Sequence, residues 1–157
     1  MGRKLSHFDE RGAAHMIDVS AKTETMRQAV ATGRIDMSEA ALSAIRDGTM
    51  KKGDVLAVAR VAGIMAAKQT SGLIPLCHPL ALSKVTVDLD IDGTGICATA
   101  TVGATGQTGV EMEALTTISI TLLTIYDMTK SMDKAMIIRD IRLIEKRGGK
   151  SGTWHAP

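Results

Sequence analysis

The chain has 157 residues, a formal net charge of +2 and a hydrophobic fraction of 45%. This length suits one ordinary domain, and the hydrophobic fraction excludes an intrinsically disordered chain. The small net charge gives no sign of a nucleic-acid surface. An aromatic fraction of 2% excludes a protein that stacks single-stranded bases on aromatic rings. We therefore expect an aliphatic core and no nucleic-acid partner.

Cysteine usage and the longest apolar stretch bear on the compartment of the protein. Two cysteines, Cys77 and Cys97, are too few for a disulfide-rich scaffold, and they lack CxxC spacing. The stretch 114–128 contains threonine and serine and is too short to span a bilayer. Residues 1–15 contain no apolar run like that of a secretory signal. They are polar, with only scattered apolar side chains to anchor them, so we expect a flexible arm there and a single α+β domain over 16–157. These features predict a cytoplasmic protein without membrane attachment.

The first half of the domain reads as one strand followed by two helices. Residues 24–35 alternate weakly and favour a strand. Ser38 suits the N-cap of a helix that stops at Gly48, and Asp54 suits the N-cap of a second helix over 55–69. Because the second helix is apolar on nearly every side, it lies either in the core or against another subunit.

The second half reads as two strands, a helix and a last strand. Residues 84–91 and 94–106 alternate with period two, and the Asp-Gly pair at 92–93 is a hairpin signal. Apolar residues at spacings of three and four predict a helix over 110–130, and 135–147 favours a strand. This order predicts an α+β fold, a ferredoxin-like antiparallel sheet with helices packed on one face.

Two groups of charged residues flank predicted helix ends. Lys51 and Lys52 precede the N-cap Asp54, where a lysine can meet an anion bound at the helix N-terminus; the alternative is a solvated loop lysine. Asp127 and Lys130 share one face at the end of the last helix, where the ammonium keeps the carboxylate ionised. A surface ion pair is the alternative, although it is less expected at the end of an apolar helix.

The segment between Pro75 and Pro79 is predicted to be a stiff, extended loop, since neither proline fits a helix interior or a central strand. This loop carries Leu76, Cys77 and His78. A histidine in fixed position can shuttle protons near neutral pH. The alternative is a buried turn in which a carbonyl oxygen satisfies the imidazole. The adjacent Cys and His have poor geometry for one metal ion, and we predict no metal site.

Two further segments are open to a functional and a structural interpretation. Glu111 and Glu113 lie in the first turn of the last helix, where acids also complement the helix dipole. The GGKSG segment at 148–152 lacks the upstream glycine of a phosphate-binding loop and fails as that motif. Its Lys150 can still clamp a phosphate, and the alternative is a disordered tail.

Glu113 and Asp127 are fourteen residues apart on one helix, which separates them by about 21 Å. They cannot both touch one small substrate group in a single chain. If both are functional, either the ligand is long or the site is shared between subunits. The apolar, alanine-rich helix over 55–69 favours subunit contact. We therefore predict an oligomer with its site at an interface.

Several uninterrupted blocks, in the same order and spacing, resemble the cyclic pyranopterin monophosphate synthase family, the protein C family of molybdenum cofactor biosynthesis. The likeness extends from about residue 12 to residue 152. The blocks that carry it are KKGDVLAVARVAGIMAAKQT, LIPLCHPLALSKV, TGQTGVEMEALT, IYDMTKSMDK and GGKSG.

The resemblance implies a lyase that acts on phosphorus–oxygen bonds. It would convert 3′,8-cyclo-7,8-dihydroguanosine 5′-triphosphate to cyclic pyranopterin monophosphate and release diphosphate. No cofactor is implied. A ferredoxin-like fold and a homohexamer, built as a trimer of dimers with sites between subunits, are implied as well.

The resemblance also implies roles for individual residues. Asp127, Lys52 and Lys130 match the catalytic residues of the family. The remaining matched positions bind substrate, with two of the basic residues, Lys68 and Arg27, near the phosphates. These positions are Leu76, Cys77, His78, Met112, Glu113, Lys68, Arg27 and Lys150.

Two other functions compete with this one. A regulatory ligand-binding domain on the same fold would bind a nucleotide without turnover, and the joint presence of Lys52, Asp127 and Lys130 disfavours it. An RNA-binding domain of this topology needs exposed aromatic residues on its sheet. The predicted strands contain none.

Overall fold

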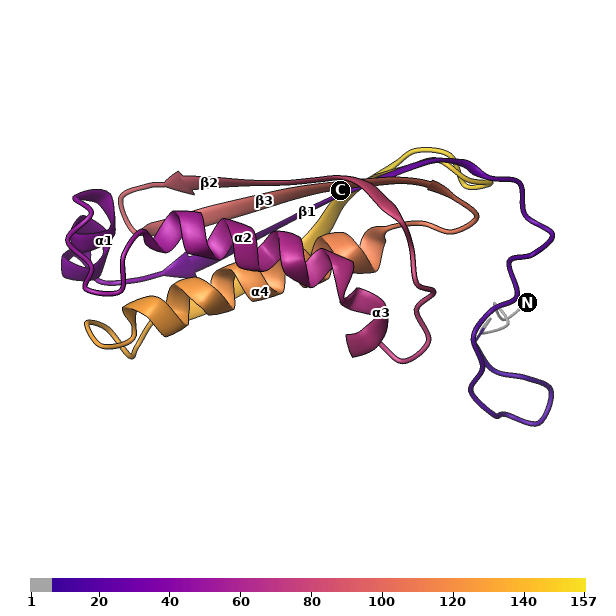
Figure 1. Ribbon diagram of the computed structural model, residues 1–157, viewed down its shortest axis with the longest axis horizontal. Helices are drawn as coiled ribbons and strands as arrows, with labels where there is room; N and C mark the ends of the chain where they lie inside the picture. The colour runs from indigo at the N-terminus through magenta and orange to yellow at the C-terminus, as the bar shows by residue number, and fades with distance from the viewer. Residues whose placement is uncertain (1–6) are drawn as a thin grey trace.

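The computed structural model describes residues 7–157, so residues 1–6 of the predicted arm lie outside the described residues. One five-stranded sheet forms a layer, and helices α2 and α4 lie side by side across one of its faces (Figure 1). The elements in chain order are β1 Thr25–Asp36, α1 Glu39–Arg46, α2 Val55–Lys68, α3 Thr70–Leu73, β2 Leu82–Ile91, β3 Gly95–Gly106, α4 Glu111–Thr129, β4 Ile137–Arg147 and β5 Trp154–His155.

The sheet has the strand order β2-β3-β1-β4-β5, and every neighbouring pair is antiparallel. The first four strands and the two long helices follow the β-α-β-β-α-β order of a ferredoxin-like fold, which confirms the predicted fold class. The sequence pattern did not indicate α3 or the two-residue strand β5. Both elements are too short to show a hydrophobic period.

The core is aliphatic, as the low aromatic content predicts. Alternate residues of the two central strands face the helices and are fully buried, because successive side chains of a strand point to opposite faces. α4 contributes three of the largest fully buried side chains, Ile118, Leu122 and Ile125. The buried set from these elements includes Ala29, Ala31, Ile35, Ile96, Ala98, Ala100, Val102, Ile118, Leu122 and Ile125.

The two long helices make a close contact at Gly63 of α2. A Cβ atom built there would clash with Thr121 Oγ1 and would lie 3.1 Å from the carbonyl oxygen of Thr117. Both threonine hydroxyls are turned back into α4, where they donate to the carbonyls four residues earlier at 2.6 and 2.7 Å. Because Gly63 has no side chain and the two threonine hydroxyls are already hydrogen-bonded within α4, the backbones of α2 and α4 can approach closely.

Both predicted N-caps are confirmed. Ser38 accepts a hydrogen bond from Ala41 N–H, and Asp54 accepts one from Ala57 N–H. α4 differs, because its N-cap residue is Val110, which has no side chain that can accept a hydrogen bond from the helix amides.

The buried part of the expectation for α2 is confirmed, and its contact with another subunit remains a prediction. One face is buried against the sheet and α4. The other face exposes Val58, Val61 and Met65, whose exposed fractions are 45%, 56% and 53%. Leu123 of α4 is also exposed, at 54%. The helix layer thus carries apolar side chains on its outer surface.

Residues 7–15 are exposed and contain an isolated bridge between Phe8 and Ala14. The flexibility of the arm and the single-domain division over 16–157 remain predictions. Within the described range, no helix is both long and apolar enough to cross a membrane.

Candidate active site at the two ends of one helix

All of the predicted site residues except Lys68 lie near one or the other end of α4. Lys52, Asp127 and Lys130 lie at its C-terminal end. Glu113 and Met112 lie in its first turn, beside the 76–78 loop. The separation expected from the helix rise is therefore preserved in the fold.

The Asp127 carboxylate forms ion pairs with two lysines, Lys130 and Lys52. Lys130 Nζ lies 2.7 Å from Asp127 Oδ1, and Lys52 Nζ lies 3.7 Å from Oδ2. Lys52 also donates to the backbone carbonyl of Asp127 at 3.1 Å. The hydrogen bond from Lys130, and then the charges of both lysines, lower the pKa of Asp127, while the carboxylate raises the pKa of Lys130. At neutral pH the Asp127 carboxylate is therefore negatively charged and the Lys130 ammonium is positively charged.

Two turns position this trio, Lys52, Asp127 and Lys130. Lys52 precedes Gly53, whose φ of +96° suits glycine, in the loop between α1 and α2. Lys130 ends α4, and the turn that follows is tied to α1 because Asp133 accepts a hydrogen bond from Ser38 N–H at 2.8 Å. A cavity of about 470 Å³ beside the trio is lined by Ala44, Thr49, Met50, Lys51, Lys52, Met128, Ser131 and Met132.

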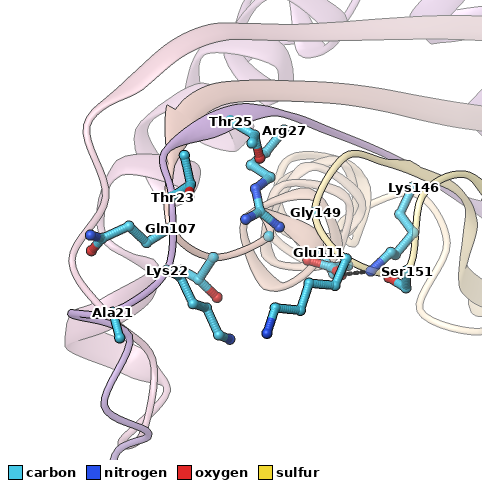
Figure 2. Close-up of a pocket in the computed structure, with 13 residues that line it drawn as sticks. Ala21, Lys22, Thr23, Thr25, Arg27, Gln107, Glu111, Lys146, Gly149 and Ser151 are labelled. Atoms are coloured by element: carbon cyan, nitrogen blue, oxygen red, sulfur yellow. Dashed lines mark ion pairs between the residues drawn. The ribbon is translucent and has the colours of Figure 1, made fainter.

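The other end of α4 opens on a cavity of about 590 Å³ that is rich in cations. Figure 2 shows Lys22 and Arg27 pointing into it from the chain that leads into and begins β1. Lys146 of β4 lies 3.4 Å from Glu111, and Lys150 lines the same cavity. Four basic side chains thus face this space, against one glutamate.

Arg27 is a largely buried charge that forms no ion pair within residues 7–157. Only 9% of the residue is exposed. Its Nε donates to the carbonyl of Gly106 at 3.3 Å. Gly149, at a φ of +77°, packs on the guanidinium so closely that a Cβ would clash with it. Burying an unpaired charge is costly, so this position suits a bound anion.

A second cavity, of about 260 Å³, adjoins the first. Lys22, Thr108, Gly109 and Glu111 line both spaces. The remaining walls are mostly apolar, with a few polar groups, as in sites for flat heterocycles. They are formed by His7, Ile17, Val19, Leu76, Cys77, His78, Leu80, Met112 and Glu113.

Glu113 is the acid of this smaller cavity. It is 4% exposed, and its burial raises the pKa of its carboxyl above the usual range of a glutamate. Burial, and then the nearby Glu113, also raise the pKa of the Cys77 thiol. Cys77 is therefore an uncharged wall residue, and Glu113 is an acid that takes up a proton more readily than an exposed one.

His78 has a carbonyl partner, as one of the two sequence interpretations expected. Its Nε2 lies 2.7 Å from the carbonyl oxygen of Ile17. A carbonyl oxygen only accepts, so Nε2 carries the proton and Nδ1 is the unprotonated nitrogen of the neutral ring.

The GGKSG segment forms the loop of a hairpin. β5 pairs with β4 through Glu145 with His155 and Lys146 with Trp154. The segment is thus anchored on both sides, which favours the clamp interpretation over a disordered tail. Lys22 and Lys146 were missed by sequence reasoning: Lys22 lies in an irregular segment, and the pairing that aims Lys146 at Glu111 connects distant parts of the chain.

Lys68 is the predicted residue that joins neither group. It lies near the C-terminus of α2 in a shallow cavity of about 350 Å³, shared with Lys84. Leu80 lines both this cavity and the smaller one described above. Residues 7–157 contain no cluster of three or more His, Cys, Asp or Glu side chains that could hold a metal ion.

The sequence model of the MoaC family matches residues 16–149. A protein of Novosphingobium aromaticivorans is 61% identical over 152 residues, which cover 97% of each chain. A protein of Parvibaculum lavamentivorans is 58% identical over 157 residues, with 98% of each chain covered. Both proteins are named cyclic pyranopterin monophosphate synthase. These matches confirm the predicted relationship, and the chain belongs to the MoaC family.

Proposed function

We propose that this protein is a cyclic pyranopterin monophosphate synthase of molybdenum cofactor biosynthesis. It converts 3′,8-cyclo-7,8-dihydroguanosine 5′-triphosphate to cyclic pyranopterin monophosphate and releases diphosphate. The names of two relatives that match over nearly the whole chain support this activity. The observation that carries it is the pairing of a cationic cavity around the buried Arg27 with an adjoining, mostly apolar one.

The two joined cavities match the two halves of the substrate. The triphosphate lies in the larger cavity, where Arg27, Lys150, Lys22 and Lys146 meet its charge. The uncapped N-terminal amides of α4 face the same region and add positive potential. The guanine-derived rings lie in the smaller cavity against the remaining predicted binding residues, Leu76, Cys77, His78, Met112 and Glu113.

The trio at the C-terminal end of α4 fits the chemistry. Ring opening and re-closure require proton transfers, which positioned lysines supply and accept. A sugar hydroxyl then attacks the α-phosphate, and the bond to the diphosphate breaks. Cations stabilise the negative charge that develops on the leaving group. Asp127 keeps Lys52 and Lys130 in place and, because it is ionised, keeps Lys130 charged.

The site forms between two copies of the chain, since the trio and the cavities lie at opposite ends of α4. We place the trio of one subunit against the cavities of another, within a homohexamer built as a trimer of dimers. The exposed apolar residues Val58, Val61, Met65 and Leu123 support an extensive subunit contact. In the same assembly, Lys68 lies close enough to contact the substrate site of a neighbouring subunit. We also propose a cytoplasmic location, which suits the free thiols of Cys77 and Cys97.

Turnover of the purified cyclic triphosphate tests the activity. Diphosphate release and pterin formation are followed for the wild type, Lys52→Ala and Asp127→Asn. We expect wild-type turnover and a loss in kcat/KM of about 100-fold or more in each folded variant, the range for a general acid or base. A wild type that binds the nucleotide and never releases diphosphate would contradict catalysis and favour a regulatory domain.

A further inference from the structure

Residues 17–23 form one wall shared by the two cavities. Ile17 and Val19 line the smaller cavity, and Lys22 lines both. Ala21 and Thr23 line the larger one, where Figure 2 shows them together with Lys22 along one continuous stretch of chain. This stretch has neither helical nor strand hydrogen bonding, so its position must be set by contacts of another kind.

Few polar contacts hold this wall, residues 17–23. Inside the segment, Lys22 N–H donates to the Val19 carbonyl, and Asp18 accepts from Ser20 N–H. Among the hydrogen bonds and ion pairs described for residues 7–23, the one that reaches the rest of the chain joins His78 Nε2 to Ile17 O. It spans 61 residues of sequence at 2.7 Å.

The partner side of this bond is stiff. His78 is half-buried and sits between Pro75 and Pro79, which restrict the backbone of the loop. The bond needs only the Nε2 proton, which both the neutral and the charged imidazole can provide. A rigid donor thus meets a carbonyl on a segment that has little structure of its own.

We propose that His78 is a positioning residue for the triphosphate: its hydrogen bond to Ile17 holds residues 17–23 as a wall and places Lys22 where the two cavities meet. Lys22 then reaches the phosphate nearest the ring. The identity of the ligand rests on the proposed function, whereas the role of the His78–Ile17 hydrogen bond in positioning residues 17–23 does not.

Hydrogen–deuterium exchange of the full-length protein tests directly whether His78 keeps residues 17–23 in place. We expect His78→Ala to raise deuterium uptake in peptides covering residues 16–24. His78→Gln, whose amide N–H can donate to the same carbonyl, is expected to restore protection. His15→Ala is the control, because this exposed histidine forms none of the side-chain hydrogen bonds described for residues 7–157. Uptake that stays at the wild-type level in His78→Ala overturns the proposal.

Steady-state kinetics separate positioning from chemistry. We expect His78→Ala to raise KM for the cyclic triphosphate about fivefold with kcat lowered less than about threefold, since fivefold corresponds to about one kcal/mol, the usual net contribution of one hydrogen bond. His78→Gln is expected to have a KM close to that of the wild type. A collapse of kcat that Gln does not rescue overturns the proposal and makes His78 part of the chemistry. If the wild type has no activity but His78→Ala still takes up more deuterium in residues 16–24, the proposed function is wrong and the positioning role of His78 is supported.

Discussion

Arg27 combines two properties that a structural arginine rarely has: it is buried, and no carboxylate of the described chain neutralises it. Isolated buried charges destabilise a protein, and replacing one with an apolar side chain of similar length relieves that cost. The guanidinium lies against Gly149 and faces a cavity shared with other cations. Its cost is offset when an anion occupies the cavity.

This arrangement predicts opposite effects of Arg27→Met on stability and on binding. We expect the melting temperature to stay level or rise, while affinity for diphosphate falls about tenfold or more because a charge-assisted pair is lost. Thermal unfolding and calorimetric titration with diphosphate measure the two effects. Arg142→Met, an exposed arginine of β4 outside both cavities, is the control. A lower melting temperature with unchanged diphosphate affinity would show that Arg27 is structural.

Glu113 predicts a pH-dependent effect on stability. Its folded pKa is raised by burial, so the folded state binds more protons than the unfolded state between the two pKa values. Stability therefore falls as pH rises through this window, which begins at the ordinary pKa of a glutamate. We expect Glu113→Gln to raise the melting temperature more at pH 8 than at pH 4. An equal change at both pH values, or a decrease at pH 8, would contradict the burial effect.

At the scale of elements, the contact between α2 and α4 depends on the missing side chain of Gly63. An added methyl group would meet Thr121 Oγ1 and the Thr117 carbonyl, and α4 cannot move without disturbing its packing on the sheet. Overpacking of this kind costs about 1–3 kcal/mol.

We expect Gly63→Ala to lower the free energy of unfolding by about 1–3 kcal/mol, measured by urea denaturation. Adding Thr121→Ala removes the nearest obstacle and should recover part of the loss. Gly72→Ala is the matched control, since a Cβ there meets nothing within 4 Å. Equal stability of Gly63→Ala and Gly72→Ala would mean that the helices are not in close contact.

The elements that could be predicted from sequence are those with local signals. Ser38 and Asp54 bond amides three residues ahead, so a short window of sequence contains the whole interaction. The long strands and α4 show their periods over ten or more residues. β5 is different, because its two residues become a strand only by pairing with β4.

The same distinction applies to the site. The order and spacing of several uninterrupted sequence blocks predicted the family, and the helix rise predicted the separation of Glu113 from Asp127. The wall formed by residues 17–23 could not be predicted, because the bond that fixes it joins Ile17 to His78. The pairing of Lys146 with Glu111 likewise connects β4 to α4 across the fold. Contacts over such sequence distances leave no local pattern.

At the scale of the whole molecule, the charged trio and the cation-rich cavity lie at opposite ends of α4. The end of α4 that carries Asp127 has the groups for proton transfer, and its other end has the anion cavity. A helix of 19 residues separates them, so they cannot serve the same small reacting group within one subunit. In the proposed assembly, two copies of the chain each supply one of these groups to a shared site.

Activity of mixed oligomers tests this account most directly. Arg27→Ala and Asp127→Asn chains, each inactive alone, are co-expressed with different tags and purified through both. We predict recovery of about a quarter of wild-type turnover, because random pairing gives that fraction of sites two intact halves. Co-expression of Lys52→Ala with Asp127→Asn is the control and should stay inactive, since both changes damage the same half. Mixed Arg27→Ala and Asp127→Asn oligomers no more active than either variant alone would contradict a site shared between subunits.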